Sequence, residues 1–142
     1  MTNRFLRKKP KELFWLCWLG IPYLIWLLSI GIELNKKISR KRGVNTALFM
    51  VLVGYSLIYC ILAVSLLISG KVDIASLRPF HFAAMAAVFL LIILASKTIV
   101  RFEKEHGLKQ SNGFGLFFGI WYFIFGIWDI QPKLNQYIKL VD

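Results

Sequence analysis

Residues 46–69 read TALFMVLVGYSLIYCILAVSLLIS, and no charged side chain interrupts this run. A helix needs about 20 apolar residues to cross the roughly 30 Å hydrocarbon core of a membrane, so the run is long enough to span it. A second run, FHFAAMAAVFLLIILAS, follows at residues 80–96, and Lys97 beside it can extend its ammonium group toward the lipid head groups. We therefore expect two central transmembrane helices, at about 46–69 and 80–100.

The composition of the whole chain is typical of a membrane protein. Hydrophobic residues make up 58% of the 142 positions, more than the about 45–50% of a soluble domain. We predict one all-α integral membrane domain over residues 1–142, with a basic N-terminal arm at 1–12 and an amphipathic tail at 129–142. The net charge of +11 indicates orientation in the membrane and contact with anionic lipid, and we expect no nucleic-acid partner.

All five tryptophans lie in two outer segments, residues 13–32 and 113–128. Tryptophan favours the membrane–water interface, so these segments differ in kind from the central runs. Gly20-Ile21-Pro22 interrupts the first segment, where the proline removes a helical hydrogen bond. The second segment is short and rich in glycine. Both suit re-entrant hairpins that enter and leave on one side, and full spans remain the alternative.

The basic residues distinguish these two topologies. If all four segments cross, lysine and arginine divide equally between the two sides. If only the central runs cross, every basic residue except Lys71 and Arg78 lies on one side. Because basic residues concentrate in the cytoplasm, the second arrangement is the more consistent one. It predicts a multi-pass protein with both termini cytoplasmic.

The two outer segments share a pattern. GIPYLIW at 20–26 aligns with GIWYFIF at 119–125, and Leu34-Asn35 corresponds to Leu134-Asn135 one residue out of register. Such pairs arise by chance in a restricted alphabet or by internal duplication, which is common in membrane proteins. With these Gly-Ile-x-Tyr and Leu-Asn segments the chain resembles small bacterial multi-pass membrane proteins of unknown function. The resemblance implies the cytoplasmic (inner) membrane of a bacterium.

Small side chains recur in three segments and would let membrane helices approach closely. They are Ser56, Cys60 and Ala63 in the first central run, Ala84 and Ala87 in the second, and Gly115 and Gly119 in the last outer segment. We expect the first two groups to pack against each other. The glycine pair either joins protomers or packs the last segment on its own chain.

A basic cluster follows the first outer segment, and we expect it to bind anionic head groups. Its members are Lys36, Lys37, Arg40, Lys41 and Arg42. In the tail, Asp129 would cap a separate helix whose apolar face, with Leu134 and Ile138, lies on the membrane surface. His106 could pair with Glu103 three residues earlier.

The sequence contains no set of residues typical of a catalytic, metal or cofactor site, and none is predicted. The central runs carry no ionisable carboxylate, histidine, lysine or arginine near mid-membrane, which argues against a transporter. We expect a non-enzymatic accessory or scaffold subunit that acts through helix packing and lipid contact, and that could shape the membrane. It would be a homo-oligomer or part of a larger complex. The alternatives are a homo-oligomeric channel or pore, as in a stress or immunity effector, and an interfacial lipid-modifying enzyme.

Overall fold

The computed structural model describes residues 2–39, 43–70 and 74–141, and every regular element in them is helical. Two helices in this part of the chain are long and apolar enough to cross a membrane, as the all-α prediction requires. The elements are α1 (Thr2–Leu6), α2 (Pro10–Cys17), α3 (Ile21–Ser29), the π turn η1 (Ile30–Leu34), the 3-10 turn η2 (Asn35–Lys37), α4 (Thr46–Ser69), α5 (Ile74–Glu105), α6 (Gly113–Trp121) and α7 (Phe123–Val141).

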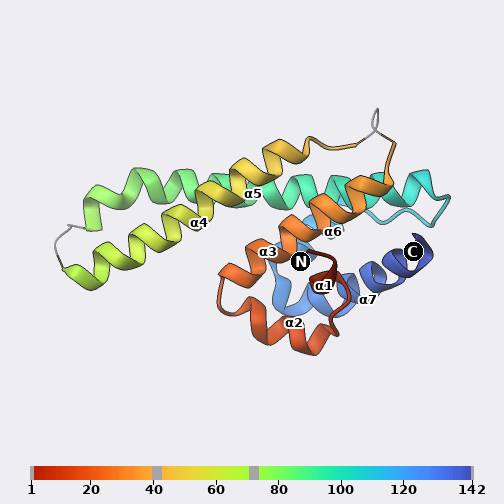
Figure 1. The fold of residues 1–142 in the computed structure, drawn as a ribbon, viewed down its shortest axis with the longest axis horizontal. Helices are drawn as coiled ribbons and strands as arrows, with labels where there is room; N and C mark the ends of the chain where they lie inside the picture. Colours follow the sequence, from red (N-terminus) through yellow and green to blue (C-terminus); the bar gives the residue numbers. More distant parts are fainter. Residues whose placement is uncertain (1, 40–42, 71–73, 142) are drawn as a thin grey trace.

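Helices α4 and α5 form a long antiparallel hairpin along the major axis of the molecule (Figure 1). Helix α4 has the predicted bounds because both of its ends are capped. The Asn45 side chain accepts hydrogen bonds from the amides of Ala47 and Leu48, and Gly70 ends the helix in the left-handed conformation at φ 63°.

Helix α5 is longer than the predicted span of 80–100. It runs from Ile74 to Glu105 and contains Pro79 in its interior. The apolar run marks only the part of a helix that suits hydrocarbon, and the helix continues through polar residues at both ends. Gly107 ends the helix in the left-handed conformation at φ 65°. The amide of Leu108, just beyond it, donates a hydrogen bond to the carbonyl of Glu103.

Each outer segment is broken into two helices that fold back on each other. In the first, α2 and α3 meet at Gly20, whose φ of 73° favours glycine. In the second, α6 and α7 meet at Tyr122 and cross closely at two glycines. A Cβ atom at Gly126 would overlap the backbone of Gly119, so only glycine fits there.

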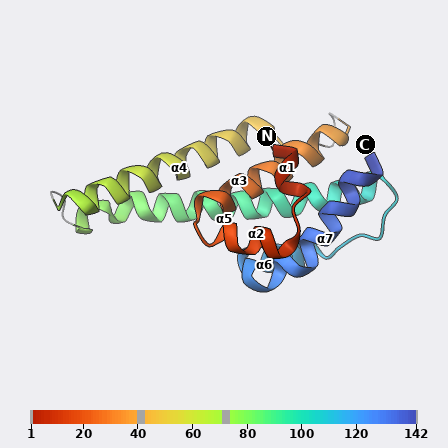
Figure 2. The same cartoon turned by 60° about the horizontal axis from the view of Figure 1, so that its bottom comes forward.

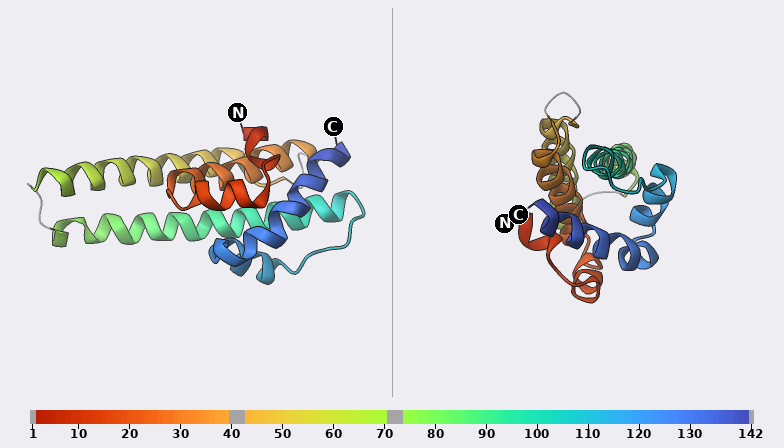
Figure 3. Two further views of the ribbon diagram at one scale, coloured as in Figure 1. Left: turned by 90° about the horizontal axis from the view of Figure 1, so that it is seen from below. Right: turned by 90° about the vertical axis from the view of Figure 1, so that its right-hand side faces the viewer.

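Both helical hairpins lie along the same half of α5, and the chain termini lie near that half (Figures 2 and 3). The core is formed there, and Trp26, Phe49 and Phe102 are its largest fully buried side chains. Gly31 lets the Phe49 ring approach η1 closely, which ties α4 to the first hairpin.

The other half of the α4–α5 hairpin extends beyond this core. Its apolar side chains are exposed, among them Ile61 (57%), Ile68 (82%) and Phe82 (66%). Within the most apolar 18-residue stretch of α4, only 11% is buried inside the protein. In water such a surface would be unfavourable, because each exposed apolar Å² costs about 25 cal/mol relative to burial.

The tail differs from its prediction. Helix α7 is continuous from Phe123, so Asp129 caps no helix start but lies inside the helix, where it pairs with Lys133 at 2.9 Å. The apolar face with Leu134 and Ile138 is buried against the protein's own core rather than left for a membrane surface. Helix α7 also contacts α2, where Phe123 and Trp128 pack against the Phe14 ring.

A candidate hydrophobic-chain groove

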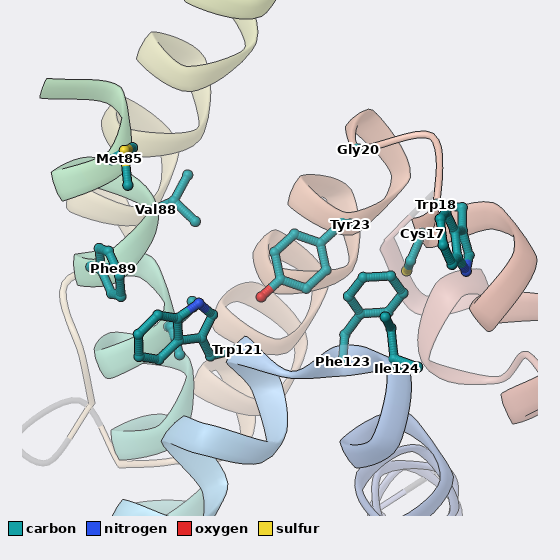
Figure 4. Close-up of a pocket in the computed structure, with 11 residues that line it drawn as sticks. Cys17, Trp18, Gly20, Tyr23, Met85, Val88, Phe89, Trp121, Phe123 and Ile124 are labelled. Atoms are coloured by element: carbon teal, nitrogen blue, oxygen red, sulfur yellow. The ribbon is translucent and has the colours of Figure 1, made fainter. Parts of the chain in front are cut away.

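The tips of the two helical hairpins and the middle of α5 enclose an apolar groove of about 500 Å³ (Figure 4). Cys17 and Tyr23 line it from the first hairpin, Trp121 and Phe123 from the second, and Val88 and Phe89 from α5. The groove exists because both chain reversals, at Gly20 and Tyr122, occur beside the same stretch of α5.

Tyr23 connects the two hairpins inside this groove. Its hydroxyl donates a hydrogen bond to the carbonyl of Ile120 at 2.8 Å. Ile120 belongs to the last turn of α6, whose carbonyls have no partner within the helix. The bond therefore satisfies a helix end that lipid could not satisfy.

Aromatic rings build the wall of the groove. Trp121 meets Phe89 edge to face with ring centroids 4.8 Å apart, and Phe123 lies 5.6 Å from the Tyr23 ring. Edge-to-face pairs of this kind add about 0.5–1.5 kcal/mol to the burial of their area. The wall is therefore a fixed surface, and α5, α6 and α3 all contribute to it.

The groove has few polar groups. Its polar side-chain groups are the Tyr23 hydroxyl, the Cys17 thiol and the indoles of Trp18 and Trp121, and the hydroxyl is engaged with Ile120. Across residues 2–39, 43–70 and 74–141, no group of three or more His, Cys, Asp or Glu side chains could hold a metal ion. A hydrocarbon chain is the ligand class that such a lining accommodates.

A buried amide holds the two hairpins in place beneath the groove. The Gln131 side chain is fully buried, and its Oε1 accepts a hydrogen bond from Nε1 of Trp26 at 2.9 Å. Its Nε2 lies 3.0 Å from the carbonyls of Leu6 and Lys8. One residue of α7 thus joins α3 and the N-terminal arm. In the sequence Gln131 is one polar residue of the amphipathic tail, and no local pattern predicts this role.

A second buried polar cluster lies at the end of α5. Glu103 is fully buried and accepts hydrogen bonds from the Tyr137 hydroxyl at 2.7 Å and from the Ser111 amide and hydroxyl. The expected pairing with His106 is wrong, because the His106 ring bonds to the Phe102 carbonyl instead. Burial raises the pKa of the Tyr137 phenol, and its hydrogen bond to Glu103 raises that pKa further.

The structure describes part of the predicted basic cluster. Lys36 and Lys37 are exposed at the end of η2, and Lys36 lies 3.4 Å from Glu33. Arg40, Lys41 and Arg42 lie outside the described residues. The binding of anionic lipid by this cluster stays a prediction.

The predicted small residues lie in different surroundings. Ser56, Ala84 and Ala87 are buried and belong to α4 and α5, which pack together, whereas Ala63 is half-buried and Cys60 is exposed. Tyr59, next to Cys60, instead reaches α5 through its hydroxyl, 3.0 Å from Nδ1 of His81.

The two predicted glycines also differ from each other. Gly119 packs against Gly126 and Ile130 of α7 within the same chain, whereas a Cβ at Gly115 would meet only Asn112 at 3.8 Å. The close approach at Gly119 therefore joins α6 to α7. The association of protomers through the Gly115 side of α6 stays a prediction.

Comparisons of this chain with protein-family models, with curated proteins and with solved structures found no match. The conclusions about function that follow depend on geometry and charge.

Proposed function

We propose that the chain is a non-enzymatic integral membrane scaffold in the inner membrane of a bacterium. In this proposal α4 and α5 span the bilayer, and the two helical hairpins enter only the cytoplasmic leaflet. The observation that carries the proposal is the difference between the two halves of the α4–α5 hairpin. One half is enclosed by the outer segments, and the other half is bare and apolar.

The level of the hairpin tips supports insertion to half depth. The tips lie beside Val88 and Phe89, whereas Lys97 marks the inner end of the apolar part of α5. Eight residues of helix from Phe89 to Lys97 rise roughly 12 Å, and half of the hydrocarbon core is roughly 15 Å. Each reversal would therefore lie near the bilayer centre, where Tyr23 satisfies the carbonyl of Ile120.

The distribution of charge supports the cytoplasmic side. Lys36 and Lys104 lie on elements at the enclosed end of the molecule, the end at which both termini lie, and Lys8 lies in the turn between α1 and α2. Basic residues next to apolar segments favour the cytoplasmic face of a membrane. Two hairpins confined to one leaflet would also widen that leaflet, which is the physical basis for a membrane-shaping role.

The bare half of the α4–α5 hairpin supports a scaffold. In the proposed placement both of its helices present large apolar side chains to the outer leaflet, with none of the chain's other helices covering them. Within a membrane the surface can pack against another helix without a hydrophobic penalty. The surface is therefore available to a membrane-embedded partner while the enclosed half anchors the subunit.

Photocrosslinking in native membranes tests the scaffold. A benzophenone amino acid at Ile61 or Phe82, both exposed on the bare half, should give a discrete adduct with a different membrane protein. The same probe at Lys104, exposed at the enclosed end, is the matched control and should not give that adduct. Adducts whose masses are multiples of 16.4 kDa would favour the homo-oligomeric pore, and crosslinks to lipid alone would overturn the scaffold.

A further inference from the structure

A second groove, of about 580 Å³, lies between α5 and α6 and is separate from the hydrophobic-chain groove. Ile93, Phe114 and Phe117 provide its apolar surface, and Lys97 and Arg101 stand at one end of it. The two basic residues are one helical turn apart, so their side chains project from the same face of α5.

The two basic side chains differ in how firmly they are held. A guanidinium nitrogen of Arg101 donates to the carbonyl of Gly43 at 3.0 Å, which fixes its position and leaves further N–H donors. Lys97 is exposed, and it forms none of the ion pairs seen among the described residues. The groove therefore combines an arginine held by a backbone carbonyl, an exposed lysine and an apolar floor.

The order of these residues along α5 matches the order of groups in a phospholipid. Lys97 and Arg101 lie at the inner end of the apolar run, where the head-group phosphates would be, and Ile93 lies one turn deeper. Phe117 lies on the facing helix, where it packs edge to face against Trp121 with centroids 5.7 Å apart. A chain leaving the cations would thus pass along aromatic surface toward the bilayer centre.

We propose that this groove is a binding site for one anionic phospholipid, with its phosphate between Lys97 and Arg101 and an acyl chain on Ile93 and Phe117. The proposal rests on the membrane placement in the proposed function, because only that placement puts the two cations at head-group depth. Charge complementarity selects an anionic lipid over a zwitterionic one, and the apolar floor selects a lipid over a free phosphate ion.

Native mass spectrometry of the full chain tests the site. The protein is released from nanodiscs of equal parts dioleoyl-phosphatidylglycerol and dioleoyl-phosphatidylcholine, and the retained lipid is identified from the mass of its complex with the protein. The wild type should keep one phosphatidylglycerol. With Lys97→Gln and Arg101→Gln together, its apparent affinity should fall about thirtyfold, since each basic residue near a surface contributes about a factor of five.

Two variants control for folding and for general charge. Lys104→Gln removes an exposed charge from the same helix but outside the groove, and it should retain the lipid. Lys97→Arg with Arg101→Lys keeps both charges and should retain it as well, so a loss in this pair would show damage to the fold and overturn the interpretation.

Three further outcomes would overturn the proposal. They are equal retention of phosphatidylcholine, equal loss in Lys104→Gln, and displacement of the lipid by soluble glycerol phosphate, which would show that the acyl chain contributes nothing. The result is independent of the crosslinks at Ile61 and Phe82. If the double variant lost the lipid but the crosslinking probes gave no protein adduct, the scaffold would be wrong and the lipid site would be supported.

Discussion

Trp26 of α3 and Gln131 of α7 are 105 positions apart in the sequence, and their side chains are joined by a buried hydrogen bond of 2.9 Å. The same amide group reaches the backbone of the N-terminal arm through its nitrogen. Three segments of the chain therefore meet at one side chain, and the two helical hairpins cannot separate without breaking these bonds.

Gln131→Leu should destabilise the protein. The substitution removes the buried partner of the Trp26 indole and of the Leu6 carbonyl, and each buried group left unpaired costs about 1–3 kcal/mol. The Lys8 carbonyl keeps its hydrogen bond from the Asn135 side chain. Thermal unfolding in detergent measures the loss. Gln136→Leu is the matched control, since Gln136 is exposed on the same helix. Equal melting temperatures for the two variants would show that the buried amide contributes nothing to stability.

Tyr137→Phe should lower stability by about 1–3 kcal/mol, because it removes a hydrogen bond to the buried Glu103 carboxylate. The effect depends on pH. The pKa of the folded phenol is raised above the ordinary 10.0, so the folded state holds the proton more tightly than the unfolded state. The contribution of Tyr137 is therefore complete below about pH 10.0 and declines as the pH rises from there toward the raised value.

Chemical denaturation of wild type and Tyr137→Phe at a series of pH values checks this dependence. The difference between their free energies of unfolding should be constant near neutrality and should shrink in alkali. A difference that grew with pH would contradict the assignment of Tyr137 as the donor.

Gly126→Ala should open the α6–α7 hairpin, because the new Cβ would overlap the backbone of Gly119. Overpacking of this kind costs about 1–3 kcal/mol. Gly54→Ala is the control, since nothing lies within 4 Å of a Cβ at that position. Limited proteolysis and melting temperature measure the outcome. If both variants resembled the wild type, the close crossing of α6 and α7 would be wrong.

Cysteine labelling in intact cells, with Cys17 and Cys60 replaced by alanine, tests half-depth insertion. Cysteines at Lys11 and Ser39, on the two flanks of the first hairpin, should both react only from the cytoplasm. A cysteine at Ser76 should react only from outside. Reaction of Lys11→Cys and Ser39→Cys from opposite sides would show that the first outer segment spans the membrane fully.

The sequence was sufficient to predict the elements that depend on local patterns. The bounds of α4 follow from an uncharged run between an asparagine and a glycine, and the break at Gly20 follows from a glycine two residues before Pro22. Both features are contained within a few consecutive residues, so they can be recognised without knowledge of the partners.

Features that depend on distant partners could not be predicted in this way. Gln131 and Glu103 look like solvated polar residues in the sequence, and only the folded chain brings the indole and the hydroxyl that bind them. What covers the apolar face of the tail could not be predicted either, because such a face has the same spacing of apolar residues whether lipid or protein covers it. The spacing in the tail is compatible with either cover, and in the structure protein covers this face.

The hydrogen bond between Trp26 and Gln131 cannot form during synthesis until the ribosome has made both residues. A ribosome adds about 5–20 residues per second, so the 105 positions between the two residues correspond to roughly 5–20 s. Throughout that interval the first hairpin exists without its acceptor, and its indole N–H must find water or a lipid carbonyl. In the proposed membrane placement, the newly made segment would therefore rest in the head-group region first and reach its final depth only when the last helix arrives.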